Sequence, residues 1–345
     1  MPDIQSQSVL PALLVFTAAS VAILLGGIRL TRLVDRLADV TGLGEAIAGA
    51  LFLGAATSLS GLVTSVVAAG DGYVDLALSN ALGGIAAQTL FLVAADLAYR
   101  HANLEHAAAS LTNMVSGLML VMMLTVLLAA GHLDPVTFLG IHPATPVLFA
   151  LYLVGLRLGS GVRTEPMWGP AETPETRPDR PEGGPEGSPG TGSLLAGILA
   201  LGLVVAVAGY LIAESGLAFV RLGGLRETVV GALVTALATS TPELVTTVAA
   251  VRRGALTLAV GGILGGNCFD VLFVGAADIA YRDGSIYHAM AGEQAFLVLL
   301  SILMTVVLIL GLVGRQRHGP GNIGFEGLAL VGLYGGAMAI LLAGG

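Results

Sequence analysis

Residues 42–100 read GLGEAIAGALFLGAATSLSGLVTSVVAAGDGYVDLALSNALGGIAAQTLFLVAADLAYR, and a closely similar stretch recurs at residues 224–282. The two copies align without a gap at a constant offset of 182 residues (224 − 42), and about half of the aligned positions are identical. Hydrophobic repeats that carry polar residues inside their apolar runs are typical of secondary transporters. The repeat therefore predicts a membrane transporter built from two related halves.

The two copies differ where polar chemistry would be located. Four residues of the second copy that bend a helix or offer a polar side chain have no equivalent in the first. They are Pro242, Glu243, Asn267 and Asp270, which match Ser60, Gly61, Ile85 and Gln88. The first half therefore offers fewer charged ligands than the second half.

The composition places the chain in a membrane. Hydrophobic residues make up 55% of the 345 residues and charged residues only 11%, and the mean hydropathy is +0.88. A soluble domain does not need so much apolar surface. The chain holds 49 glycines, which suit close contacts between helices in lipid, and its single cysteine, Cys268, excludes an internal disulfide. We therefore expect an all-α polytopic membrane protein with lipid around it.

Hydrophobic stretches near the ~20 residues that cross a bilayer predict about ten transmembrane helices. Five precede a polar break and five follow it, which predicts two five-helix repeats at residues 1–162 and 192–345. The expected spans are Val9–Leu30, Leu43–Ala69, Val74–Ala98, Ala107–Ala130, Thr145–Leu158, Ser193–Ala213, Leu225–Val251, Leu256–Ala280, Ala289–Leu312 and Phe325–Ala343.

The break between the halves covers residues 163–191 and is rich in proline, with Glu, Gly and Ser between the prolines. A segment of this composition cannot bury an apolar core. We expect it to be a disordered, solvated linker on the cytoplasmic side.

Arginine is the only strongly basic residue type of the chain, and its placement predicts the orientation. Most arginines follow odd-numbered spans, which places them on one side of the membrane. They are Arg29, Arg32, Arg36, Arg100, Arg157, Arg163, Arg252, Arg253, Arg315 and Arg317. We therefore expect both termini outside a membrane, taken to be a prokaryotic plasma membrane. An odd number of spans in each half then gives the two halves opposite orientations.

The seventh expected span contains Thr239-Ser240-Thr241-Pro242-Glu243 at its middle. Pro242 has no backbone N–H, so the carbonyl of Ala238 should lose its helical partner. Irregular backbone at membrane depth is tolerated only beside a cavity or a polar partner. Thr239 and Glu243 are four residues apart and share a helix face. These hard oxygen ligands suit Na⁺ or Ca²⁺.

The eighth expected span contains Gly265-Gly266-Asn267-Cys268-Phe269-Asp270. Its glycines should let another helix approach and bring Asp270 towards Glu243. A charged carboxylate at this depth costs at least ~2.5–3.5 kcal/mol, so it must bind a cation or a proton, or be hydrated. The simpler alternative is that the two acids only join helices as polar contacts.

Other polar residues of the repeat have structural explanations. Asp96 and Asp278 lie at the ends of spans beside Tyr and Arg, where we expect them to anchor the helices at the membrane interface. His106 and His288 match each other across the repeat and lie near a membrane surface. We expect these histidines to pair or to cap backbone groups.

The two motifs of the second copy resemble those of the calcium/cation antiporter superfamily, which includes the sodium/calcium and calcium/proton exchangers. Residues 239–243 (TSTPE) are similar to the hydroxyl-rich Pro-Glu motif of that family. Residues 265–270 (GGNCFD) are similar to its Gly-Ser-Asn-x-x-Asp/Asn motif. The likeness covers both repeats, and the five-plus-five layout extends it to nearly the whole chain.

This resemblance implies ten helices in inverted halves, a cation site at the midplane, and alternating access in which two helices slide past an eight-helix core. It also implies roles for single residues. Glu243 becomes the carboxylate ligand, Thr239 offers a carbonyl or hydroxyl, and Asp270 is the polar ligand of the eighth span. The full set of expected ligands is Glu243, Asp270, Thr239, Ser240, Asn267, Thr57, Ser58 and Gln88.

The first repeat departs from the family pattern. Gly61 stands where the family has a glutamate, and Ser60 replaces the neighbouring proline. Two carboxylates can still neutralise one Ca²⁺, which prefers six to eight oxygens, and we expect water to enter the space left at Gly61. Loss of the proline and the glutamate predicts a more regular second span.

These features predict a secondary active antiporter that exchanges Ca²⁺ or another cation against Na⁺ or H⁺. Two alternatives stay open. One is a monovalent cation/proton antiporter, which the missing glutamate favours, and the other is a degenerate homologue that transports nothing. The sequence shows no nucleotide-binding loop, no Cys/His cluster and no nucleophile with its base. We therefore expect no enzymatic activity, no cofactor besides the transported cations and no nucleic-acid partner, while the oligomeric state stays open.

Overall fold

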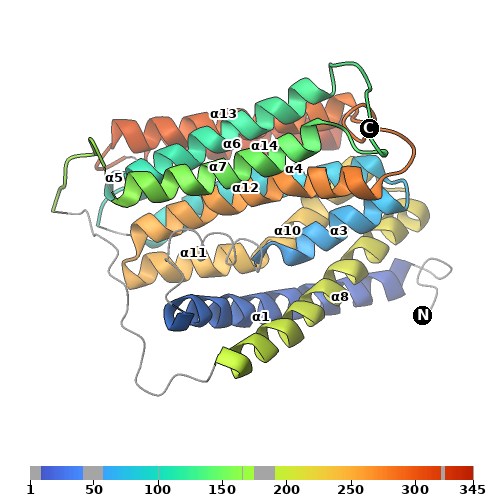
Figure 1. Ribbon diagram of the computed structural model, residues 1–345, viewed down its shortest axis with the longest axis horizontal. Coiled ribbons are helices and arrows are strands. Elements are labelled where there is room, and N and C mark those ends of the chain that lie inside the picture. The colour runs from blue at the N-terminus through green and yellow to red at the C-terminus, as the bar shows by residue number, and fades with distance from the viewer. Residues whose placement is uncertain are drawn as a thin grey trace.

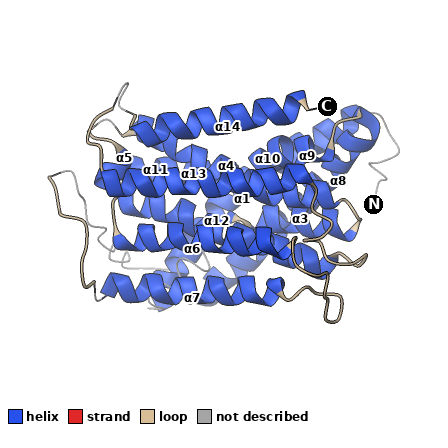
Figure 2. Cartoon of the chain, turned by 90° about the horizontal axis from the view of Figure 1, so that it is seen from above, coloured by secondary structure: helices blue, strands red, loops and turns tan. Residues whose placement is uncertain are grey.

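Long helices that run side by side in alternating directions make up the computed structural model of the chain (Figures 1 and 2). It describes residues 9–41, 57–99, 101–164, 166–174, 191–319 and 323–344. The helices in these ranges are α1 (Val9–Thr41), α3 (Leu59–Gly70), α4 (Val74–Ala98), α5 (Leu104–Ala107), α6 (Leu111–Ala130), α7 (Ala144–Thr164), α8 (Thr191–Gly223), α9 (Glu227–Val229), the π-helix η2 (Val230–Thr235), α10 (Ala236–Thr239), α11 (Thr241–Arg253), α12 (Leu256–Ala280), α13 (Gly292–Gly314) and α14 (Phe325–Ala343).

The expectation of an all-α polytopic membrane protein is confirmed. Eight described helices are long and apolar enough to cross a membrane, and a ninth span forms if Glu227–Thr239 and Thr241–Arg253 count as one bent helix. The expected second span, residues 43–69, is described only from residue 57 onwards, where α3 forms its last part. Its earlier part, and the linker residues 175–190, lie outside the described residues.

The bundle has a buried centre and a peripheral pair of helices. In α4 and α12, 78% and 72% of the apolar window is buried inside the protein, against 22% in α1 and in α8. Helices α1 and α8 pack mainly against each other and lie over α3 and α11. Figure 1 shows this crossed pair along one side of the bundle. The polar residues of α4 and α12 are therefore enclosed by protein, whereas α1 and α8 face lipid.

Chain direction agrees with two inverted halves. The start of α1 and the end of α14 lie at one end of the bundle, while the end of α7 and the start of α8 lie at the opposite end (Figure 1). Helices α4 and α12, which carry the related stretches of the repeat, run in opposite directions in the same view. An odd number of spans in the first half explains this inversion.

Repeat-related aspartates close the two ends of the bundle in the same way. Asp96 Oδ1 accepts a hydrogen bond from the backbone N–H of Leu104 at 2.7 Å, and Asp278 Oδ1 accepts one from Ile286 N–H at 3.2 Å. Both side chains are buried, at 2% and 0% exposed. They therefore cap the turns that follow α4 and α12, and their expected role as anchors at the membrane interface stays a prediction.

Related histidines show that the repeat extends beyond the aligned stretch. The ring of His106 bonds to the carbonyl of Arg315 at 2.7 Å, and the ring of His288 bonds to the carbonyl of Leu133 at 2.6 Å. Leu133 and Arg315 are themselves separated by the 182-residue offset (315 − 133). The expectation that these histidines hold backbone groups is confirmed, and the inverted relation reaches into the loops.

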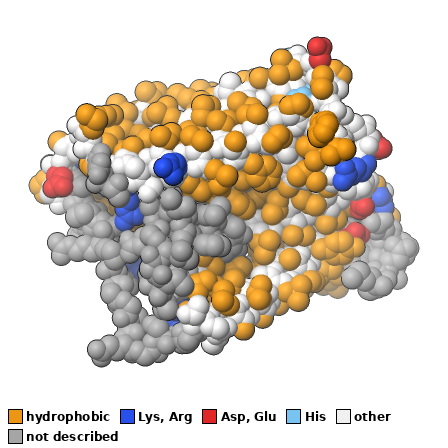
Figure 3. Space-filling model, viewed as in Figure 1, with side chains coloured by type: hydrophobic (Ala, Val, Ile, Leu, Met, Phe, Trp, Pro, Cys, Tyr) orange, Lys and Arg blue, Asp and Glu red, His pale blue; other side chains and the backbone are white. Residues whose placement is uncertain are grey.

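Hydrophobic side chains cover most of the visible outer surface between the two ends of the bundle, and most charged side chains on that face lie toward the ends (Figure 3). The exposed apolar residues include Leu199 and Leu203 of α8 and Leu153 of α7, which are 73%, 67% and 59% exposed. Lipid would cover such a surface, so the outside of the bundle supports a membrane location.

Candidate cation site

The second repeat is broken at Ser240, where the two parts of the bent helix meet at an angle of 46°. Pro242 lies in the first turn of α11, where its missing N–H costs no hydrogen bond. The proline alone would predict a free carbonyl at Ala238. Instead, the hydroxyl of Thr241 donates a hydrogen bond to it at 2.6 Å. The break therefore contains its own replacement donor for this carbonyl.

A π-helix, η2, precedes this break. The side chain of Asn80, which belongs to the first repeat, forms a hydrogen bond with it. Thr235 Oγ1 donates to Asn80 Oδ1 at 2.7 Å, while Asn80 Nδ2 donates to Gly61 O at 3.1 Å and to Ser65 Oγ at 2.9 Å. One buried amide thus joins α3, α4 and η2. The comparison of repeats missed Asn80 because its partner position holds Gly262.

The first repeat is broken at the matching place. Ser58 has φ −91° and ψ 4°, and Ser240 has φ −94° and ψ 4°. The prediction of a more regular second span is therefore wrong at this point. Packing maintains the break without proline, because Ser60 Oγ donates to Thr239 O at 3.4 Å and Gly209 of α8 lies against the Ser60 backbone.

A small enclosed cavity lies between the two breaks and brings Glu243 and Asp270 together. It measures about 10 Å³, counted as the space open to the centre of a water molecule, which is near the minimum for one water or one ion of similar size. Both carboxyls are buried, at 5% and 1% exposed. The cavity is lined by Ser58, Gly61, Asn80, Gly84, Gln88, Thr239, Ser240, Glu243, Asp270 and Phe273.

Hydroxyls of the first repeat reach the acids of the second. Ser58 Oγ donates to Glu243 Oε1 at 3.3 Å and is also a hydrogen-bond partner of Asp270. The hydroxyl of Thr57 bonds to Glu243 as well, although Thr57 itself does not line the cavity. Residues 57 and 58 therefore hold both acids in place.

Gln88 and Asp270 occupy the same position in the two repeats (270 − 88 = 182) and meet each other at the cavity. Gln88 Nε2 donates to Asp270 Oδ2 at 2.6 Å and to Ser240 Oγ at 3.2 Å. The amide thus turns its donor towards the acid. Its own oxygen, Gln88 Oε1, has no hydrogen-bond partner in the described part of the protein.

Two carboxylate oxygens at the cavity also lack a hydrogen-bond partner within the described part of the chain. Among the described residues, neither Glu243 Oε2 nor Asp270 Oδ1 has a hydrogen-bond partner. Buried polar atoms are normally paired, and an unpaired buried oxygen costs free energy. Oxygens of this kind are ligands for a hard cation, and a proton could satisfy one or two of them, so the residues present fit a hard cation.

Two predicted ligands differ in their placement. Thr239 lines the cavity, and its hydroxyl donates to Thr235 O at 3.0 Å and to Ala236 O at 3.2 Å, which leaves the lone pairs of its oxygen open to a cation. Asn267 is buried outside the cavity lining, and its amide donates to Thr89 Oγ1 at 3.0 Å. The cavity therefore brings together Glu243, Asp270, Gln88, Ser58, Ser240 and Thr239, with Thr57 behind them.

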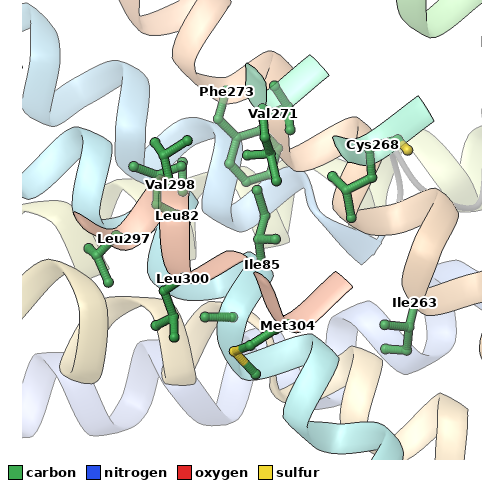
Figure 4. Packing of buried hydrophobic residues seen from close by; sticks show 14 of the residues in the cluster. Leu82, Ile85, Ile263, Cys268, Val271, Phe273, Leu297, Val298, Leu300 and Met304 are labelled. Carbon is green, nitrogen blue, oxygen red and sulfur yellow. The ribbon is translucent and has the colours of Figure 1, made fainter. Parts of the chain in front are cut away.

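The space above Gly61 is filled by the ring of Phe273. A Cβ atom placed on Gly61 would lie 2.8 Å from Phe273 Cε2 and 3.6 Å from Thr239 Oγ1. Figure 4 shows Phe273 among the buried side chains around Val271 and Ile85. An aromatic ring from the second repeat therefore takes the place of a side chain at Gly61, and the expectation of water beside Gly61 stays a prediction.

The arrangement can hold one cation at a time. It offers two carboxyls, an amide oxygen and hydroxyls around a single small cavity. No third acidic, histidine or cysteine side chain joins the two carboxyls among the residues that the structure describes. The site therefore has at most two negative charges with which to attract its ligand.

Comparison with known proteins agrees with this geometry. The family described as "Sodium/calcium exchanger protein" matches residues 11–156 and 193–343. CaxA of Alkalimonas amylolytica, provisionally named an antiporter, is 27% identical over 274 residues, which cover 79% of this chain and 81% of that protein.

Two solved structures share the arrangement of helices. One is the sodium-calcium exchanger NCX_Mj soaked with Na⁺ and Sr²⁺, with a TM-score of 0.63, 18% identity, and coverage of 96% of this chain and 98% of that one. The other is the H⁺/Ca²⁺ exchanger CAX, with a TM-score of 0.68, 16% identity, and coverage of 97% and 82%. Identities this low establish a common fold.

Proposed function

The chain belongs to the sodium/calcium exchanger protein family, and from this membership we propose that it exchanges cations by alternating access at the cavity between Glu243 and Asp270. The family and the fold support cation antiport in general. The cavity supports the choice of place, because it is lined by Ser58 and Ser240 at the two breaks and by residues of α4 and α12, two largely buried helices.

The unpaired oxygens of the cavity carry this proposal. Gln88 Oε1, Glu243 Oε2 and Asp270 Oδ1 come from three elements and are all buried without a hydrogen-bond partner. A structural contact between helices would pair these oxygens with donors. A transported cation, by contrast, needs ligands that it can leave again.

Ca²⁺ is the cation that the charge of the site favours. Two ionised carboxylates balance one divalent cation, and the amide and hydroxyl oxygens are ligands of the kind that Ca²⁺ accepts. Na⁺ or H⁺ then enters the same cavity after Ca²⁺ has left. Because the cavity admits one ion of about the size of a water molecule, the two ions occupy it in turn.

A specific observation favours a second candidate, the monovalent cation/proton antiporter. Gln88 donates an N–H to Asp270, which offsets part of the negative charge of that carboxyl. Gly61 contributes no acid in the position that matches Glu243. In this alternative the same cavity exchanges Na⁺ or K⁺ for a proton, and a degenerate homologue without transport is the third outcome of the test.

The direction of insertion is part of the proposal. The arginines that follow the odd-numbered spans favour a cytoplasmic linker and outward termini. We place the protein in the plasma membrane of a prokaryote.

Flux into proteoliposomes tests the proposal. Liposomes are loaded with Na⁺, or are made acidic inside, and uptake of external Ca²⁺ is measured for the wild type, Glu243→Gln and Asp270→Asn. Glu172→Gln is the matched control, because Glu172 is an exposed acid outside the helices. Folding of each variant is checked by its elution as a single species and by its thermal unfolding.

We expect gradient-driven Ca²⁺ uptake that Glu243→Gln and Asp270→Asn abolish and that Glu172→Gln retains. The gradient that drives uptake identifies the counter-ion. Folded wild-type protein that moves no Ca²⁺ but exchanges Na⁺ or K⁺ for H⁺ would establish the monovalent alternative. Absence of all exchange would leave the non-transporting class.

A further inference from the structure

Gly61 and Phe273 form an unequal pair at the cavity. The repeat relates Gly61 to Glu243 (243 − 61 = 182) and Phe273 to Phe91 (273 − 91 = 182). The position that carries an acid in the second repeat therefore carries a glycine in the first. An aromatic ring covers this glycine. The cavity lining therefore includes both the carboxylate of Glu243 and the hydrocarbon ring of Phe273.

The glycine is explained by the ring and not by the backbone. Gly61 lies within α3 and is not one of the glycines with positive φ. A glycine inside a helix costs ~1 kcal/mol relative to alanine, so something must favour the absence of a side chain. The ring of Phe273 does so, because any Cβ at position 61 would stand 2.8 Å from Cε2.

Phe273 cannot move aside without disturbing its neighbours. Its ring packs edge to face on Phe269, with centroids 6.0 Å apart and an interplanar angle of 85°. Phe269 packs in turn on Tyr152 of α7, at 5.8 Å and 67°. Phe273 itself is only 3% exposed. The ring is therefore a fixed wall of the cavity.

We propose that Phe273 determines the ion specificity of the site, by filling the volume that an acid at position 61 would need and so limiting the cavity to one small cation. This inference rests on the proposed function, because it concerns the ion that the same cavity accepts. Phe273 excludes cations larger than Ca²⁺ by contact with the ring. It also excludes a second cation, because the added space and the added charge are both absent.

The ring makes restoration of the missing acid depend on two positions. Gly61→Glu alone places its side chain against Phe273 and should disrupt the cavity by overpacking. Phe273→Ala alone opens the volume above Gly61 and leaves the charge unchanged. The double variant Gly61→Glu/Phe273→Ala provides both the space and the acid. Relief of the overlap alone restores the fold, because substitutions of residues in contact are not additive, whereas the proposal predicts in addition that the double variant regains Ca²⁺ affinity.

Two measurements test the inference on the full chain. The first is the thermal unfolding temperature in detergent as a function of Ca²⁺, Sr²⁺ or Ba²⁺ concentration, since a cation that binds the folded protein raises it. The second is uptake of the same cations into proteoliposomes. Phe91→Ala is the matched control, because Phe91 is the repeat-related ring and does not line the cavity.

We expect Phe273→Ala to raise the ratio of Ba²⁺ to Ca²⁺ affinity about tenfold, whereas Phe91→Ala leaves this ratio unchanged. Gly61→Glu should weaken Ca²⁺ binding about tenfold or more, and the double variant should regain at least the wild-type affinity. Phe273→Ala alone decides the matter if Gly61→Glu does not fold.

An unchanged Ba²⁺/Ca²⁺ ratio in folded Phe273→Ala would overturn the inference, and so would additive losses in the double variant. The binding measurement keeps this failure distinct from failure of the proposed function. If the wild type binds cations with the expected selectivity but transports none, the proposed function fails and the role of Phe273 stands. If the wild type transports Ca²⁺ and the ring does not affect selectivity, only the inference fails.

Discussion

Glu105 is a buried carboxyl in the short helix α5, which lies at one end of the bundle (Figure 1), and it does not line the cation cavity. Burial, and after it the nearby carboxyls of Asp96 and Glu326, raise the pKa of Glu105 well above its usual value of 4.5. Between pH 4.5 and the raised pKa, folded protein keeps a proton that the unfolded chain has lost. Stability therefore falls as the pH rises through this window.

We predict that Glu105→Gln removes this pH dependence. The amide resembles the protonated carboxyl and does not ionise, so the variant should gain stability relative to the wild type by up to about 1.4 kcal/mol per pH unit above pH 4.5. Thermal unfolding of both proteins between about pH 5 and 8 measures the difference. Glu172→Gln, which changes an exposed acid, should follow the wild type. Parallel curves for Glu105→Gln and the wild type would contradict the prediction.

The sequence identified some residues of the site and could not identify others. Glu243 and Asp270 were predictable because an acid inside an apolar span needs a partner. Asn80 and Phe273 were not predictable from the sequence. Asn80 aligns with a glycine of the second repeat, and Phe273 is identical to its counterpart Phe91. Their roles come from contacts between halves, and a pattern within one half does not contain them.

Gly27 of α1 and Gly209 of α8 form repeat-related contacts between the peripheral pair of helices and the two breaks (209 − 27 = 182). A Cβ on Gly27 would stand 2.8 Å from Pro242 Cγ, and one on Gly209 would stand 2.6 Å from Ser60 O. Pro242 and Ser60 also match each other in the repeat (242 − 60 = 182). The helices α1 and α8 thus each contact the break of one half through a glycine. Sliding of these two helices would need contacts without protruding side chains.

We predict that Gly209→Ala slows exchange and also destabilises the fold. The added methyl group must push α8 away from the backbone of Ser60, at a cost of about 1–3 kcal/mol, and it should lower flux about tenfold. Gly202→Ala on the same helix is the control, because its nearest neighbour, Leu59 Cδ2, is 3.8 Å away. Flux per folded protein in liposomes measures the effect, and equal flux in the two variants would contradict it.

Helices were easier to predict from the sequence than their interruptions. The apolar runs of α4, α12 and α14 indicated these helices with nearly the bounds that the structure gives. The seventh span was expected as one kinked helix, yet the structure divides it into α9, η2, α10 and α11. The π-helix depends on Asn80 in another span. Hydropathy detects apolar length but does not detect a hydrogen bond between spans.

The whole bundle presents its charged groups at two ends, so the direction of insertion decides which end meets each ion gradient. The loop between α6 and α7 carries the exposed residue Asp134, and the segment after α7 carries the exposed residue Glu172. In the proposed orientation, Asp134 lies outside the cell and Glu172 in the cytoplasm.

We predict that Asp134→Cys reacts with a membrane-impermeant thiol reagent in intact cells, and that Glu172→Cys reacts only after the cells are permeabilised. Cys268 is the only native cysteine and is buried, so the wild type supplies the background. Labelling of each variant before and after permeabilisation is compared on gels. Reaction of Glu172→Cys in intact cells, with protection of Asp134→Cys, would show the opposite orientation.

If Ca²⁺ and its counter-ion occupy one cavity in turn, two-substrate kinetics should show it. Initial Ca²⁺ uptake into proteoliposomes is measured while the external Ca²⁺ and the internal counter-ion are varied independently. Occupation in turn predicts ping-pong kinetics, in which double-reciprocal plots at different counter-ion concentrations are parallel. Converging lines would mean that both ions are bound at once. Either this result or the absence of any uptake by folded protein would contradict the exchange of two ions at one cavity in turn.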